Sequence, residues 1–319
     1  MPRTASHPST VDIVGVHVGD DAVHLLRVSA AGGTRTITSY RALTLADGAV
    51  EHGVVRAAGV LPPSTARAAV SIAGGAPVRI ALTTRDCAVV SLSGEREEPL
   101  AALTAIAAAS GRPGDAVWAD VVSSGGRAVG LVGALRSSVL RTTAAFERAG
   151  LRVTAIEGAP VSLVAAATAL VALPAGTWTA RCTAPPLDVR TSVSRSGRPE
   201  GAVVRANEAC AAAFTLSSDA PGSLPIDLLE AMRDRLGRRA AKLTAPSVAS
   251  FALAFGAALG GLPRALDSPD LRAAVVVRPL VTTGGALPRW AVEPLPRAAN
   301  DVTLTRARPI RRRVARGRP

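Results

Sequence analysis

The sequence predicts an α/β chain of two domains, and three observations support this. Its 319 residues exceed the roughly 100 to 200 that one domain usually has. Apolar residues make up 48% of the chain, which excludes a protein that is disordered throughout. Segments with the alternating pattern of strands are interspersed with segments whose apolar residues recur at helical spacing, and Gly-rich turns separate them.

The first ordered segment is predicted to be a three-stranded antiparallel meander. Residues 1–10 are polar, contain two prolines and are expected to be disordered. Beyond them, turn sequences such as Gly19-Asp20-Asp21 separate apolar runs that are rich in β-branched residues. The predicted strands cover residues 11–18, 22–28 and 34–45.

The central part of the chain is predicted to alternate between short strands and helices. Leu100, Leu103 and Ile106 recur at helical spacing, and Gly150 ends a second amphipathic run. The pattern predicts strands over residues 66–72, 78–83, 117–123, 128–135 and 151–156. It predicts helices over residues 95–110, 137–149 and 161–173.

The last third of the chain is less regular. Residues 177–204 resemble strands but are interrupted by arginines and by Pro185-Pro186, which suit only an edge or a loop. The pattern then predicts a charged helix over residues 224–243, a buried helix over 248–262 and a strand over 271–280. A Pro- and Arg-rich tail over residues 286–319 is expected to be disordered.

The net charge of +13 is concentrated at the C-terminus. Seven arginines and no acidic residue lie between Arg306 and Arg318, which leaves the rest of the chain mildly basic. Such a tail fits contact with anionic lipid headgroups, non-specific contact with nucleic acid, or a solvated end without a partner.

Composition excludes several classes of site. Aromatic residues are only 3% of the chain, so stacking sites for RNA or sugars are not expected. Cys87, Cys182 and Cys210 are far apart and lack metal-ligand spacing, which argues against a disulfide framework and a metal site and favours a reducing cytoplasm. The N-terminus lacks the apolar core of a secretory signal, and the longest apolar runs are too short to span a bilayer.

The most informative stretch is residues 11–28, Val-Asp-Ile-Val-Gly-Val-His-Val-Gly-Asp-Asp-Ala-Val-His-Leu-Leu-Arg-Val. A glycine at the tip of a tight hairpin exposes backbone N–H groups that can bind phosphate, although an ordinary hairpin has the same pattern. The stretch resembles the first phosphate loop of the actin-like ATPases, and in particular of the PilM-type pilus assembly proteins. Further stretches resemble that family in the same order: residues 40–53, residues 68–80 with the later hairpin, residues 146–157 and residues 251–262.

This resemblance implies an actin-like (ribonuclease H-like) fold of two lobes. The first lobe, 1A, would cover residues 11–175, with a small subdomain called 1C inserted at about 54–150. The second lobe would cover residues 176–285 and would be reduced, because little chain is left where the family has subdomain 2B.

The resemblance also implies a nucleotide site. Its contacts would be Gly15, His17, Gly19, Asp20, Asp21, Asp188, Thr191 and Gly256. His17 stands where the family has an aspartate that holds water around Mg²⁺, and Arg190 replaces a glycine of the second phosphate loop. Asp20 and Asp21 would repel a polyphosphate unless a cation lay between them, and both are also common turn formers. ATP and Mg²⁺ are therefore expected to bind weakly or not at all.

No other catalytic or metal-binding motif competes, and no catalytic residue is expected. Arg79, Arg85 and Asp86 fit a solvated face as well as a site. The resemblance implies a cytoplasmic scaffold of a type IV pilus assembly platform, peripheral to the inner face of the plasma membrane. Its partners would be other platform components and the cytoplasmic peptide of a PilN-like membrane protein, bound between 1A and 1C. Such docking needs no ATP turnover.

Two alternatives to a scaffold stay open. An active actin-like ATPase or sugar-kinase-type phosphotransferase would hydrolyse ATP with Mg²⁺ and lose this activity in Asp188→Ala. A nucleic-acid-binding protein that acts through its basic tail would lose DNA affinity when residues 300–319 are deleted, although no specific nucleic acid is expected.

Overall fold

The first sheet has the strand order and directions of an actin-like lobe. In the computed structural model, which describes residues 10–56, 61–84, 87–92, 115–173, 176–206, 211–260, 264–268 and 270–276, the order is β10-β6-β1-β2-β3. The strands are β1 (Val11–Val18), β2 (Ala22–Ala31), β3 (Thr34–Thr44), β6 (Val78–Leu82) and β10 (Val153–Gly158). The first three form an antiparallel meander, and β6 and β10 run parallel to β1. This arrangement confirms the predicted fold class.

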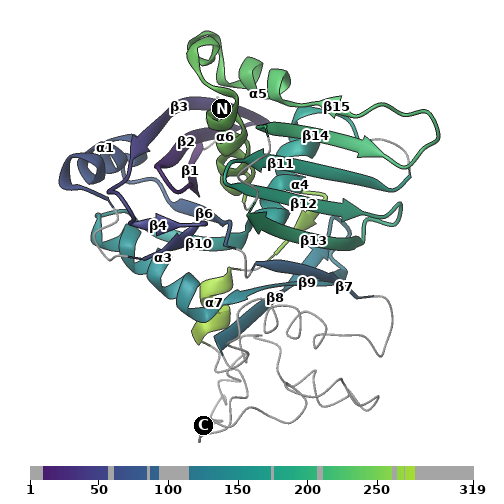
Figure 1. The fold of residues 1–319 in the computed structure, drawn as a ribbon, viewed down its shortest axis with the longest axis horizontal. Helices are drawn as coiled ribbons and strands as arrows, with labels where there is room; N and C mark the ends of the chain where they lie inside the picture. The colour runs from purple at the N-terminus through teal and green to yellow at the C-terminus, as the bar shows by residue number, and fades with distance from the viewer. Residues whose placement is uncertain are drawn as a thin grey trace, which may run out of the picture.

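The second sheet is built from two separate parts of the chain (Figure 1). Its order is β15-β14-β11-β12-β13-β7-β9-β8-β16, and every neighbouring pair is antiparallel. Three of its strands, β7 (Ala88–Ser91), β8 (Ala116–Ser123) and β9 (Ala128–Leu135), come from the predicted insertion, whereas β6 of the same range lies in the first sheet. The other strands are β11 (Trp178–Ala184), β12 (Leu187–Val193), β13 (Pro199–Ala206), β14 (Ala213–Ser218), β15 (Ile226–Asp227) and β16 (Leu266–Asp267).

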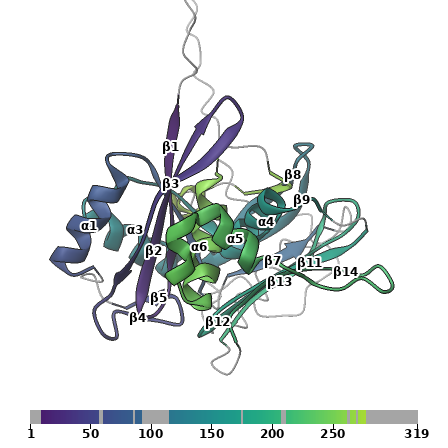
Figure 2. The same ribbon diagram turned by 90° about the horizontal axis from the view of Figure 1, so that it is seen from above.

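Two apolar helices, α4 (Ala159–Leu170) and α6 (Ala245–Ala258), form a layer between the two sheets (Figure 2). They pack against each other, α6 against β1 and β2, and α4 against β12. From Val248 onward every residue of α6 is buried, as expected for a helix that is apolar on all sides. Helices α1 (Pro63–Ala73) and α3 (Arg136–Arg148) cover the other face of the first sheet.

Smaller elements complete the fold. A two-stranded ribbon, β4 (Val50–Glu51) and β5 (Val54–Val55), follows the meander. Helix α5 (Leu229–Leu236) and the 3₁₀-helix η2 (Arg238–Lys242) precede α6, and α7 (Leu271–Val276) packs beside β10. In the part of the chain that the structure describes, no helix is long and apolar enough to cross a membrane.

Most of the predicted strands and helices are confirmed, but residues 66–72 are helical and not extended. Pro63 lies in the first turn of α1, where its restricted φ favours a helix. The alanine-rich sequence continues the helix, and Gly74 ends it with a φ of 54°. Helix propensity and end signals therefore outweigh the short alternation that had predicted a strand.

In the last third of the chain, two further predictions were wrong in part and one strand was not predicted. The helix predicted over 224–243 is β15, α5 and η2, because Gly237 interrupts it with a φ of 81°. The strand predicted over 271–280 begins as helix α7, since the Asp270 carboxylate accepts the Arg272 N–H at its start. Strand β14 was not predicted. The predicted helix over 95–110 and the tail over 286–319, with Arg306 to Arg318, lie outside the described residues.

Candidate functional site

The β1–β2 turn, the predicted first phosphate loop, is tied to the β4–β5 turn by Asp20. Its two carboxylate oxygens accept the backbone N–H groups of His52 and Gly53, each at 2.9 Å. The Gly19 N–H bonds the Ala22 carbonyl at 3.0 Å and closes the turn. Asp21 is exposed beside it. Asp20 therefore already holds a protein segment with both oxygens.

His17 lies away from solvent, on the face of the first sheet that α6 covers. It pairs across the strands with His24, with 6.1 Å between ring centroids, and the His24 ring meets the Phe251 ring edge-on at 4.9 Å. Burial lowers the pKa of His17 to about 3 and that of His24 to about 4, so both are neutral at pH 7. No ring nitrogen of the pair has a hydrogen-bond partner among the described residues.

Of the three glycines predicted to contact the nucleotide, Gly19 lies in the β1–β2 turn, and Gly15 and Gly256 lie at helix contacts. A Cβ on Gly15 of β1 would come within 1.9 Å of the Ala254 carbonyl oxygen of α6. A Cβ on Gly256 of α6 would come within 1.8 Å of the Ser162 carbonyl oxygen of α4. These positions require glycine because α6 approaches the backbone of both neighbours closely.

The structure does not bring together the residues predicted for the second phosphate loop. Asp188 and Thr191 lie in β12, three residues apart, and so point to opposite faces of the sheet. The Thr191 hydroxyl donates to the Pro160 carbonyl of α4 at 3.0 Å and therefore faces the helical layer. Asp188 faces the other way.

Asp188 is held by arginines on this outer face of the sheet. Its carboxylate accepts from Arg181 and Arg190, each at 2.9 Å, and from the Thr183 hydroxyl at 2.8 Å. Burial would raise the pKa of Asp188, but these three donors outweigh it and keep the pKa below its usual value. Arg190, which replaces the loop glycine of the family, is thus a partner of Asp188.

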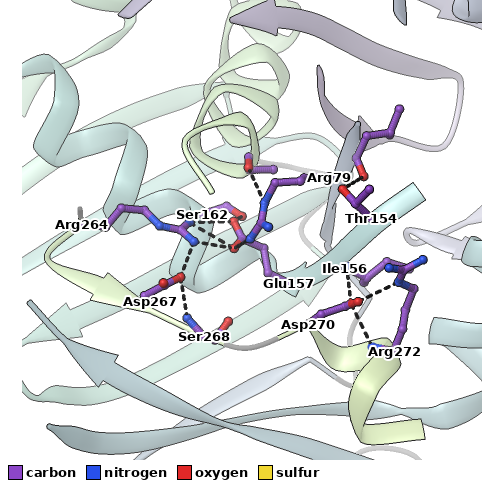
Figure 3. Close-up of polar contacts among 12 residues, drawn as sticks. Arg79, Thr154, Ile156, Glu157, Ser162, Arg264, Asp267, Ser268, Asp270 and Arg272 are labelled. Carbon is purple, nitrogen blue, oxygen red and sulfur yellow. Dashed lines mark hydrogen bonds and ion pairs between the residues drawn. The ribbon is translucent and has the colours of Figure 1, made fainter. Parts of the chain in front are cut away.

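A buried ion network, which the sequence reasoning missed, surrounds Glu157 at the end of β10 (Figure 3). The Glu157 and Arg264 side chains are 0% and 1% exposed, and the Arg264 guanidinium donates to both Glu157 oxygens at 3.1 Å. Arg79 of β6 donates to the same carboxylate at 3.3 Å, and the Ser162 hydroxyl donates at 2.6 Å. Burial alone would lower the pKa of Arg264. The charges of Glu157 and Asp267 outweigh this effect and raise the pKa above its usual value, so the guanidinium stays charged.

The segment that carries Arg264 joins the two sheets. Asp267, which also binds Arg264, belongs to β16, and β16 pairs with β8 of the second sheet. A few residues later the Asp270 carboxylate accepts the Ile156 N–H of β10 at 2.8 Å. Two signals in the sequence could have revealed this network. Arg79 lies within the apolar strand β6, and Glu157 lies within the family-like stretch 146–157. Arg85 and Asp86 lie outside the described residues.

These residues do not present the donor set that the resemblance implies for Mg²⁺ and a nucleotide. Asp20 holds backbone amides, Asp188 is paired with arginines on the outer face, and His17 is a buried neutral imidazole. The described residues also contain no group of three or more His, Cys, Asp or Glu side chains that could hold a metal ion. No reaction step through such a group follows from this geometry.

Comparisons with known proteins bear on the fold. No family model matches the sequence. No curated protein matches it either. Among solved structures, the chain is similar to one in the PilM–PilN type IV pilus biogenesis complex, with 17% identity, a TM-score of 0.44, and 61% of each chain covered.

Two other solved structures are similar over 61% of this chain. One is the cytoplasmic domain of EpsL, an inner-membrane component of the type II secretion system of Vibrio cholerae. Its identity is 11%, its TM-score is 0.38, and 71% of the EpsL chain is covered. The other is a Bacteroides thetaiotaomicron protein with an actin-like ATPase fold and unknown function. Its identity is 8%, its TM-score is 0.37, and 70% of that protein's chain is covered. The fold class of the chain rests on the strand order and strand directions of its first sheet.

Proposed function

We propose that the chain is an actin-like scaffold of a type IV pilus or related secretion platform. It binds the cytoplasmic peptide of a PilN-like membrane protein and works without ATP turnover. In this proposal it lies at the cytoplasmic face of the inner membrane, where the arginines between Arg306 and Arg318 contact anionic lipid.

The observation that carries this proposal is that three carboxylates are already engaged by protein groups, whereas Asp21 of the β1–β2 turn is exposed. Asp20 accepts two backbone amides, Asp188 is bound by two arginines, and Glu157 is bound by Arg264 and Arg79. A Mg²⁺ ion takes oxygen ligands and keeps several waters, so it would have to displace charge-assisted bonds that are already made. A scaffold that docks a peptide needs none of these carboxylates for chemistry.

The first experiment is a calorimetric titration of the folded protein with ATP and Mg²⁺. The proposal expects no heat of binding beyond dilution, with circular dichroism of the same sample as the control for folding. Micromolar binding would contradict the proposal that the nucleotide site is degenerate. Hydrolysis by the wild-type protein that is lost in Asp188→Ala, and kept in the exposed control Asp234→Ala, would support the enzyme alternative.

The second experiment tests the partner. A synthetic peptide from the cytoplasmic N-terminus of the PilN-like membrane protein should bind saturably, and a scrambled peptide of the same composition should not. Absence of binding at high micromolar peptide would count against the scaffold role, whatever the outcome with ATP.

A further inference from the structure

The two edges of the first sheet differ in how they are covered. At one edge, the Asp270 carboxylate and the Arg272 guanidinium bond the β10 backbone, to the Ile156 N–H at 2.8 Å and the Val153 carbonyl at 2.6 Å. The opposite edge is β3, a strand of 11 residues without proline, whose pairing with β2 is regular from Ser39 to Thr44 and shifts register between Ser39 and Ile37. Exposed edges are usually short, bulged or covered, because their free backbone groups pair with other chains.

The register shows which backbone groups of β3 point outward. The Leu45 N–H donates to the carbonyl of Asp21, the residue just before β2, so Leu43, two residues earlier, also turns its backbone towards β2. Tyr40 and Ala42 alternate with these residues and turn theirs to the open edge. Within the described residues neither has a backbone partner on that side.

The ends of the β3 edge are bonded, which leaves its middle open. The Thr44 carbonyl accepts from the Thr65 hydroxyl of α1 at 3.2 Å. The Arg35 carbonyl accepts from the Arg235 guanidinium of α5 at 2.9 Å. Between Thr44 and the register shift that separates Ser39 from Ile37, the outward N–H and C=O groups of Tyr40 and Ala42 repeat at every second residue, as a strand ladder requires.

Basic side chains line this edge. Arg35 and Arg41 belong to β3, and Arg235 comes from α5, which packs beside the strand. Arg239 is close enough to Tyr40 that its charge opposes the rise in the Tyr40 pKa that burial causes. Among the described residues, none of these four arginines forms an ion pair.

We propose that β3 is a docking edge for an acidic, extended segment of a partner protein, which adds a sixth strand to the first sheet. The outward backbone groups of Tyr40 and Ala42 would supply the ladder, and the four arginines would attract and orient acidic side chains. Nucleic acid is the weaker match, because its phosphates would use the arginines but not the paired N–H and C=O groups. This surface does not depend on the proposed function.

The first test measures binding of a fluorescein-labelled peptide of about ten residues with alternating Glu and Val, by anisotropy at low salt. Saturable binding is expected, and the matching Lys–Val peptide should not bind. Arg235→Glu/Arg239→Glu should weaken binding about tenfold or more through charge reversal. Arg195→Glu, in the exposed turn between β12 and β13, reverses one charge away from this edge and should leave binding within about twofold.

The second test distinguishes strand addition from simple charge attraction. On binding, hydrogen exchange at the Tyr40 and Ala42 amides should slow by at least about tenfold. Exchange at the inward Leu43 amide should stay unchanged. Ala42→Pro removes an outward N–H without touching the β2–β3 ladder, and it should abolish the protection in a protein that still unfolds cooperatively. Lack of saturation, equal weakening by Arg195→Glu, or tighter binding of single-stranded DNA without amide protection would overturn the proposal.

Discussion

Two buried polar clusters border the helical layer, and their hydrogen bonding is opposite. At the end of β10, the Glu157 carboxylate accepts from Arg264, Arg79 and Ser162. In the β1–β2 hairpin, the ring nitrogens of His17 and His24 have no partner among the described residues. The first cluster keeps its charges in the interior, whereas the second is buried only because both rings are neutral.

This difference separates two ways of burying polar groups in the interior of the protein. A charged cluster must be complete, because one missing partner leaves an unpaired charge. A neutral imidazole pair tolerates the absence of partners at a steady cost to stability, which increases when the pH falls. The two clusters should therefore respond differently to mutation and to acid.

The largest expected effect follows from breaking the charged cluster. Glu157→Ala should lower the free energy of unfolding by about 3 to 5 kcal/mol, because Arg264 would remain buried without its counter-charge. Urea unfolding followed by circular dichroism measures this. Glu157→Leu/Arg264→Met should recover part of the loss, since Arg264 is then no longer buried without a counter-charge, while Arg79 keeps only its hydrogen bond to the Ala257 carbonyl. A loss below about 1 kcal/mol in Glu157→Ala would contradict the difference between the clusters.

The histidine pair predicts sensitivity to mild acid. Both pKa values are depressed in the folded state, so the stabilisation is complete above pH 6.5 and is lost as the pH falls towards 4 and 3. In that range the two histidines are protonated in the unfolded chain but stay neutral in the native state. The free energy of unfolding therefore falls by about 1.4 kcal/mol per pH unit for each histidine. Urea midpoints between pH 6.5 and 5 measure the slope, and His17→Leu/His24→Leu should flatten it. An equal slope in the double variant would rule this origin out.

A smaller change of opposite sign tests the cost of the missing partners. His17→Leu should raise the free energy of unfolding at pH 7 by about 1 kcal/mol, because an apolar side chain of similar size removes two buried nitrogens without partners. Thermal unfolding measures it. A lower stability would mean that the ring nitrogens are satisfied in solution, most simply by a buried water.

The smallest effect is expected at the surface. Arg56 and Glu51 form an ion pair of 2.7 Å with both side chains more than half exposed. Arg56→Ala should change the free energy of unfolding by no more than about 0.5 kcal/mol, and salt should remove even that. A change as large as that of Glu157→Ala would mean that exposure does not explain the difference between charged pairs in this protein.

Local sequence predicted the meander and the buried helix, because their apolar patterns are long and their turns are marked by glycine and aspartate. It did not predict α1, where proline and alanine outweigh a brief alternation. It also did not predict that Asp188 and Thr191 would lie on opposite faces, because they were assigned to a loop and not to strand β12. The phosphate-binding role of these residues stays a prediction.

By itself, the sequence determined the N-terminal meander, its turns and the buried helix α6, since these depend on neighbours within a few residues. Only the tertiary structure decided which polar groups meet. Glu157 and Arg264 are 107 residues apart in the chain, and nothing near either predicts the other. The physical reason is that the free energy of a buried charge or imidazole depends on the partners and the dielectric around it, and folding alone brings those together.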